Sequence, residues 1–208
     1  MQRPPAPLDE ATFPDVLVGA QRGEAWAAET MFRDLQPRVL RFLRSAEPRA
    51  ADDLSGEVWL AMARGIASFT GGLDDFRAWV FSIARRRLAD HRRTGARRAT
   101  DPTDHEVFAN RADGADTAEI ALEHLSGQAA VDLITSSLPS EQAEVLVLRI
   151  VAELDVHHVA EVMGRSANWV RVTQHRALNR LAVRFTGGVD EVFQVPVIPT
   201  PSPTICPS

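Results

Sequence analysis

The side chains best suited to read another molecule lie on one face of a helix predicted over residues 167–182. An arginine guanidinium can make two parallel hydrogen bonds to a guanine edge, and an asparagine amide can do the same with adenine. The opposite face carries Val170, Ala177 and Leu181 at spacings of seven and four, as expected of a buried stripe. The outward face is therefore expected to contact bases. Its members are Asn168, Arg171, Val172, His175 and Asn179.

The residues before this helix supply the start and stop signals of a helix-turn-helix. Asp155 can cap a short helix over Val156–Met163, and Gly164 can end it because glycine adopts the left-handed conformation at little cost. Ser166 can cap the second helix, and Ala160 is small enough for a close helix crossing. Because this motif places its second helix in the DNA major groove, DNA is the expected partner. The alternative is an ordinary helical hairpin with a solvated polar face.

A second candidate site surrounds a helix predicted over residues 76–93, where apolar residues recur three and four apart. A Gly-containing loop over residues 68–75 precedes it, and Asp90 is the only acid among the arginines of its far end. Cations beside aromatic side chains suit binding of a single nucleic-acid strand, although a run of like charges is often only a solvated face. These arginines are Arg85, Arg86, Arg87, Arg92, Arg93, Arg97 and Arg98.

The elements that must position these side chains are predicted to be helices. Earlier helices are expected over residues 13–22, 25–44 and 52–67, with a disturbance near Pro37. No long β-branched runs alternate with polar residues, so the chain is predicted to be all-α. A length of 208 residues allows one large or two small domains.

The distribution of charge divides the chain. The formal net charge is −5, but residues 1–98 carry +3, residues 99–140 carry −7 and residues 141–185 carry +1. Two near-neutral to basic modules are thus joined by an acidic connector, which suits a nucleic-acid binder despite the negative total. All 23 basic residues are arginine, so each cation is permanently charged.

Composition also argues against several classes of protein. A single cysteine, Cys206, excludes an internal disulfide framework, and the His157–His158 pair has no further ligands at metal spacing. No apolar run approaches 18 residues and no signal core opens the chain, so we expect no membrane insertion and a cytoplasmic location. No phosphate-cradling loop, Ser-His-Asp order or metal cluster supports an enzyme, and no cofactor is expected.

Four segments, taken in order, resemble the extracytoplasmic-function (ECF) class of bacterial RNA polymerase sigma factors over roughly residues 15–185. They are AQRGEAWAAETMFRDLQPRVLRFLR, AADDLSGEVWLAMARGIASFTG, FRAWVFSIARRRLADHRR, and LPSEQAEVLVLR followed by the helix-turn-helix with VRVTQHRAL. The order and spacing of the set carry the resemblance, rather than any single segment. It implies a transcription initiation factor that binds the polymerase core, recognises −35 and −10 promoter elements and promotes promoter opening.

The resemblance assigns residues to three partners. The group facing the β′ clamp helices is Asp53, Glu57, Trp59 and Met62. In the family, the loop before the arginine-rich helix takes a flipped base of the −10 element. The group that faces this element is Phe69, Thr70, Asp74, Asp75, Arg85, Arg86, Arg92 and Arg93. The group facing the −35 element is Ser166, Asn168, Arg171, Val172, His175 and Arg176. Trp79 could stack on bases, but its place on the apolar stripe favours core packing.

The resemblance also implies a four-part organisation. A region 2-like domain is expected over residues 1–98, an acidic linker, flexible or partly helical, over 99–135, a region 4-like domain over 136–186 and a Pro-rich tail over 187–208. Expected partners are promoter DNA and the polymerase core, through its β′ clamp helices and β flap, with an anti-sigma factor as a further candidate. The tail contains an apolar segment hypothesised to fold back on the chain or dock on polymerase.

Three positions depart from the family pattern. Gly56 stands where the family usually has Gln, Arg86 where it has Asn, and Glu153 where it has a turn glycine. An alternative function is a helix-turn-helix regulator with an N-terminal sensing or adaptor domain. That alternative shares the second module but gives no reason for the arginines that follow the aromatic helix.

Overall fold

The computed structural model describes residues 8–99 and 118–186, and every regular element in this part of the chain is a helix. The predicted all-α class, with two helical domains and a helix-turn-helix, is confirmed. The Pro-rich tail, Cys206 and linker residues 100–117 lie outside the described residues. The elements are α1 (Phe13–Gln21), α2 (Ala25–Ala46), α3 (Ala51–Gly65), a 3₁₀ turn (Ile66–Ser68), α4 (Leu73–Ala99), α5 (Ala118–Ser137), α6 (Ser140–Ile150), α7 (Val156–Met163) and α8 (Ala167–Thr186).

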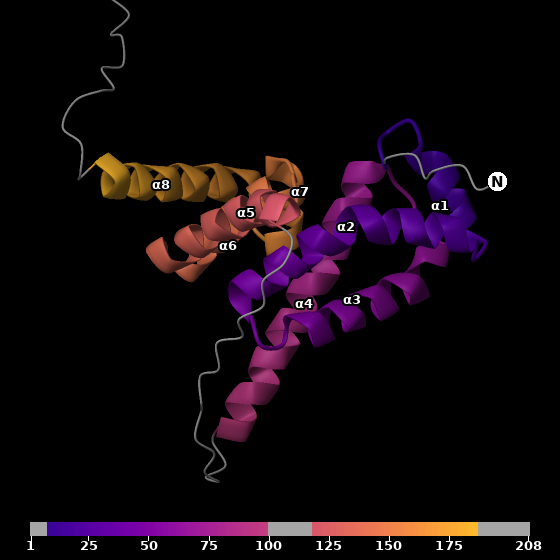
Figure 1. Ribbon diagram of the computed structural model, residues 1–208, viewed down its shortest axis with the longest axis horizontal. Helices are drawn as coiled ribbons and strands as arrows, with labels where there is room; N and C mark the ends of the chain where they lie inside the picture. The colour runs from indigo at the N-terminus through magenta and orange to yellow at the C-terminus, as the bar shows by residue number, and fades with distance from the viewer. Residues whose placement is uncertain (1–7, 100–117, 187–208) are drawn as a thin grey trace, which may run out of the picture.

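The first module, α1 to α4, is organised around buried aromatic rings on α4. Phe76 lies 5.4 Å from the Phe13 ring centroid, and Phe81 meets Phe42 edge-on at 5.6 Å. These rings are almost completely buried, and tilted or edge-on pairs of this kind stabilise a core beyond their buried area. α4 is 27 residues long, about 40 Å at 1.5 Å per residue, and its far end projects beyond the other helices (Figure 1).

The bounds of α4 correct two expectations. The helix begins at Leu73 rather than Phe76, so Asp74 and Asp75 belong to its first turn and not to the preceding loop. The reason is local: the Gly72 N–H donates to Asp75 Oδ2 at 2.8 Å, and carboxylates favour a helix N-terminus. The helix also continues past Arg93 through Gly95, since one interior glycine costs only about 1 kcal/mol.

Helix α2 was expected to be disturbed near Pro37, yet the helix, 22 residues long, runs through that residue without a break. Its buried face holds it in place: Met31, Leu35 and Val39 on either side of the proline are fully buried. Packing of this face therefore outweighs the hydrogen bond that a proline removes.

The second module, α6 to α8, contains the helix-turn-helix with the predicted signals. The His158 N–H donates to Asp155 Oδ1 at 2.8 Å, which caps α7. Gly164 ends α7 with φ 64° and ψ 39°, the left-handed conformation. The Trp169 N–H then donates to Ser166 Oγ at 3.2 Å at the start of α8. Each of these three predictions from the sequence is confirmed.

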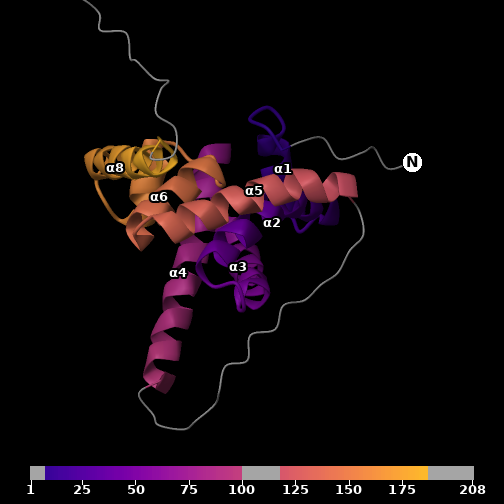
Figure 2. The same ribbon diagram turned by 60° about the vertical axis from the view of Figure 1, so that its left-hand side comes forward.

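The two modules pack against each other. Helix α7 lies on α4, and α5 runs along α2 while also contacting α6 (Figure 2). On α5, Val131 and Ile134 are buried, so the C-terminal part of the predicted linker is helical, the second of the two forms expected of it. Helix α5 contacts α2 of the first module and α6 of the second, and such long-range contacts cannot be read from acidic composition.

Candidate nucleic-acid interface

The outward face of α8 that the sequence predicted is exposed in the structure. Val170 and Ala177 are fully buried against the rest of the second module, which fixes the rotation of the helix. The polar stripe is thereby turned outward, and Val172 adds an apolar side chain that is 41% exposed. The exposed members are Ser166, Asn168, Arg171, Val172, His175, Arg176 and Asn179.

Two arginines that the sequence did not single out hold α8 in place. Arg149 on α6 donates to the Leu154 carbonyl and, through Nε, to Gln174 Oε1 on α8 at 3.2 Å. Arg165 stacks over the Trp169 ring at 5.3 Å and donates to Glu141. These contacts join residues up to 25 positions apart, so no local spacing could have indicated them.

A loop over residues 69–72 forms the second candidate surface, at the N-terminus of α4. Phe69 is half-buried, with its ring centroid 5.5 Å from Phe76 and 5.1 Å from Trp79. Trp79 packs closely over Gly65, where an added Cβ would lie 2.7 Å from its ring. The expectation that Trp79 belongs to the core is therefore confirmed, and the loop presents Phe69 from a rigid aromatic base.

Gln21 on α1 anchors this loop from the other side. Its Nε2 donates to the Phe69 carbonyl at 2.9 Å and to the Ile66 carbonyl at 3.2 Å. Sequence reasoning missed this residue because a lone glutamine at a helix end carries no pattern. Thr70 is exposed between these supports.

Each carboxylate oxygen of Asp75 has a polar partner. Oδ2 accepts from the Gly72 N–H, and Oδ1 lies 3.2 Å from His158 Nε2 on α7. The Gly72 hydrogen bond, followed by the His158 hydrogen bond, lowers the pKa of Asp75 below its ordinary value. Asp75 therefore remains ionised and engaged, whereas the exposed Asp74 pairs only with Arg77 at 3.3 Å among the described residues.

The arginines of α4 do not gather at this loop. Arg92 lies about 25 Å from Asp75 along the axis of α4, so these two side chains are too far apart to line one pocket. Arg92 is bound to Glu47 and to the Ala46 carbonyl at the end of α2, and Arg93 pairs with Asp90. Arg85 pairs across the modules with Glu144 at 3.0 Å. Arg86 is exposed and has no ion pair in the part of the chain that the structure describes.

The third predicted group lies on α3. Asp53 and Glu57 are exposed, and Trp59 is half-buried, with its ring tilted against that of Phe32 at a centroid distance of 4.9 Å and its indole N–H donating to Gln36. Met62 is buried in the core at 6% exposure, so it supports this face from beneath. Gly56 is exposed with open space around it, so its effect is confined to this surface.

These features define a class of protein: a two-module DNA-binding protein with a helix-turn-helix and an arginine-rich helix. Residues 31–98 match the family model described as Sigma-70 region 2, and residues 136–182 match Sigma-70 region 4. The chain is 32% identical over 183 residues to the ECF RNA polymerase sigma factor BldN of Streptomyces coelicolor, covering 87% of this chain and 69% of that protein. It is 33% identical over 184 residues to the ECF RNA polymerase sigma factor ShbA of Streptomyces griseus, covering 83% and 95%.

The chain belongs to the ECF RNA polymerase sigma factors. It is therefore a transcription initiation factor that acts with RNA polymerase core and promoter DNA. A solved structure of CnrH in complex with the cytosolic domain of CnrY superposes with a TM-score of 0.56 at 18% identity, over 84% of this chain and 97% of that one, and shows the shared fold. Within the described ranges, no helix combines the length and apolarity needed to cross a membrane.

Proposed function

We propose that this sigma factor reads the −35 element with α8 and the −10 element with the loop over residues 69–72 and the exposed side of α4. The observation that carries the assignment is the intact helix-turn-helix whose polar stripe is fully outward. Arg171, Val172, His175 and Arg176 contact base edges, and Ser166 and Asn168 contact phosphates at the start of the helix.

The −10 assignment rests on a rigid aromatic loop beside a cationic helix. Phe69 and Thr70 sit at the tip of the loop, supported by Gln21 and Trp79, where a flipped base would find a preformed surface. Among the α4 arginines whose side chains the structure describes, Arg86 is the one best placed to contact phosphate, since the others, Arg77, Arg85, Arg87, Arg92 and Arg93, already pair with carboxylates.

The polymerase-facing surface is assigned to Asp53, Glu57 and Trp59 on α3, with the β′ clamp helices as partner and Met62 supporting them from the core. The second module is assigned to the β flap of the polymerase as its binding partner. The four-part division at residues 98, 135 and 186 is part of this proposal, as are a cytoplasmic location and the absence of a catalytic role.

The direct test is transcription in a purified system. Polymerase core plus this chain is expected to start RNA synthesis at a promoter that the chain selects, whereas core alone does not. A helix-turn-helix regulator with a sensing domain would need another sigma factor for initiation. Failure of core and chain together to initiate, on promoters enriched from the native genome, would favour that alternative.

Gln21→Leu is expected to weaken reading of the −10 strand without affecting −35 duplex binding. Loss of two hydrogen bonds should cost about 1–3 kcal/mol of loop stability, because the Phe69 and Ile66 carbonyls lose their donor. Binding to a single-stranded −10 probe and to a −35 duplex measures the two effects separately. Gln128→Leu is the matched control, since among the described residues the amide of Gln128 donates only to Asp132, on its own helix. Equal weakening of both probes would contradict a positioning role for Gln21.

Arg86→Ala is expected to reduce the salt dependence of promoter binding by roughly one counterion, a change of about 0.7–0.9 in the log–log slope. The reason is that Arg86 is exposed without a partner in the described part of the chain. Arg92→Ala should instead lower the free energy of unfolding and leave the slope nearly unchanged, because Arg92 holds the end of α2. Binding titrations across salt concentrations, with urea unfolding of each variant, distinguish these results. A reversed pattern would place Arg92, and not Arg86, on the DNA.

A further inference from the structure

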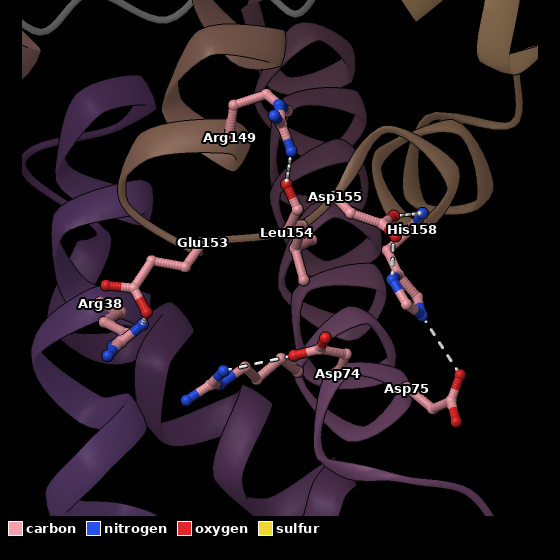
Figure 3. A network of polar contacts seen from close by, with 9 residues as sticks. Arg38, Asp74, Asp75, Arg149, Glu153, Leu154, Asp155 and His158 are labelled. Atoms are coloured by element: carbon pink, nitrogen blue, oxygen red, sulfur yellow. Dashed lines mark hydrogen bonds and ion pairs between the residues drawn. The ribbon is translucent and has the colours of Figure 1, made fainter. Parts of the chain in front are cut away.

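The seam between the two modules is held by three charge pairs that we call the clasp: Asp75–His158, Arg38–Glu153 and Arg85–Glu144. Figure 3 shows the first two, with His158 of α7 pointing at Asp75 of α4 and Glu153 pointing at Arg38 of α2. Each pair joins a residue of the first module to one of the second. Two of the first-module members, Asp75 and Arg85, belong to the group assigned to the −10 element.

We propose that the clasp is a proton-sensitive, self-closing contact in which His158 holds the second module against two side chains of the −10 reading surface, Asp75 and Arg85. This proposal rests on the −10 assignment made above. In the closed form, the Asp75 and Arg85 side chains are engaged by the second module, and α7 lies against α4. The recognition face of α8 stays exposed, so closure affects the two reading surfaces unequally.

The geometry around His158 suits a charged ring. Its side chain is 17% exposed, Nε2 lies 3.2 Å from Asp75 Oδ1, and Nδ1 lies 3.0 Å from Asp155 Oδ1. The Nδ1 contact is a close charge pair without the alignment of a hydrogen bond. On α7, the negative charge of Glu161 also favours the charged form of the His158 ring. The neighbouring His157 acts on Asp155, whose pKa its charge helps to lower. Nearby on α4, Asp74 is paired with Arg77.

The sign of the pH effect follows from these groups. Burial, the largest single influence, lowers the pKa of His158, but Asp75, Asp155 and Glu161 together outweigh it and raise the pKa above its ordinary value. A raised pKa means that protonation stabilises the closed form below the ordinary histidine pKa, about 6.5, and that this stabilisation disappears as pH rises through the raised value. Because the pKa of Asp75 is lowered, its contribution is lost only in acid, below about pH 4. The clasp is therefore tightest between about pH 4 and 6.

Glu153 gives independent evidence that side chains of the second module hold it against the first. It has φ 56°, the left-handed region where glycine is favoured, and it occupies the turn position that resembles a glycine of the family. Its carboxylate lies 2.5 Å from Arg38 Nη1, whose side chain is 21% exposed. A glutamate is less favourable than glycine in this left-handed backbone conformation. Its presence there places a carboxylate where it reaches Arg38 of the other module.

A pocket that is partly open to solvent, of about 180 Å³, lies at the seam, lined from the first module by Phe42 and Leu88 and from the second by Ala143 and Val147. The three charge pairs are partly exposed, and pairs of this kind contribute little each. Binding of DNA to α4 can therefore compete with closure.

The experiment measures the distance between modules by fluorescence energy transfer in the full chain. Dyes are placed by Ala63→Cys and Leu178→Cys, both exposed positions, in a Cys206→Ser background. We expect the ratio of closed to open forms to fall as pH rises from 6 to 8, by no more than about tenfold per pH unit because one proton is involved. His158→Gln should abolish this dependence, and His157→Gln, the neighbouring exposed histidine, should retain it.

Glu153→Gly serves as a second variant that does not threaten folding, because it relieves the left-handed turn. It should shift the ratio toward the open form by roughly two- to fivefold, the effect of one exposed pair. Both His158→Gln and Glu153→Gly should tighten binding of a single-stranded −10 probe at pH 6 in proportion to their opening. A pH-independent ratio in the original chain, or an unaltered pH response in His158→Gln, would overturn the proposal.

The −10 probe separates this proposal from the proposed function. Energy transfer that responds to pH while probe affinity stays constant would overturn the link between closure and the −10 surface. Absence of probe binding in every variant, including the open ones, would instead count against the −10 assignment itself.

Discussion

Replacing Arg171 by alanine is expected to weaken binding to the selected −35 duplex by about 1–3 kcal/mol, or roughly 5- to 150-fold. The guanidinium stands on the outward stripe of α8, one residue from the buried Val170, which fixes its direction. A bidentate contact to a base edge is lost with the side chain, and no other group of the helix can replace it. Equilibrium binding to the selected duplex, compared with a scrambled duplex, measures the change.

The comparison with scrambled DNA decides the role of Arg171. A base contact predicts a loss confined to the selected sequence, whereas a phosphate contact predicts equal losses on both. Arg180→Ala is the matched control on the same helix, because Arg180 is exposed but donates to Gln142 on α6. It should leave sequence preference unchanged. A loss for Arg180→Ala equal to that of Arg171→Ala would show that the effect is one of helix charge and not of base reading.

The helix-turn-helix could be predicted from the sequence because its signals are local. Asp155, Gly164 and Ser166 act within four residues of their own positions, and the apolar spacing of α8 sets its buried face. The beginning of α4 was predicted less well. Gly71, Gly72, Asp74 and Asp75 have the composition of a loop, but the hydrogen bonds from the Gly72 N–H to Asp75 and from the Phe76 N–H to the Gly72 carbonyl show that the helix has already begun.

The contacts between modules could not be predicted from the sequence. Asp75 and His158 are 83 positions apart, and neither residue type nor spacing pairs them. The departure at Glu153 was visible, but its partner Arg38 could be found only in three dimensions. Sequence reasoning treated Asp75 and Arg85 as groups free to meet DNA, whereas the structure shows both holding the second module.

The largest effect on stability is expected from Phe76→Ala, a loss of about 3–5 kcal/mol in the free energy of unfolding of the first module. Phe76 is fully buried on α4, within 6.0 Å of the rings of Phe13, Phe69 and Trp79. Removal of its ring leaves a cavity that these side chains can fill only by moving away from their present positions. Urea unfolding followed by circular dichroism measures the loss.

The same substitution tests how the reading loop is supported. Because Phe69 rests partly on Phe76, binding of a single-stranded −10 probe should fall with stability, while −35 duplex binding, which depends on the separate core around Val170, should persist. Phe32→Ala is the control: Phe32 is 46% exposed and contacts Trp59 on the opposite surface, so its removal should cost much less. If Phe76→Ala unfolded no more easily than Phe32→Ala, the aromatic cluster would not be the foundation of the loop, and the −10 surface would have to draw its rigidity from Gln21 alone.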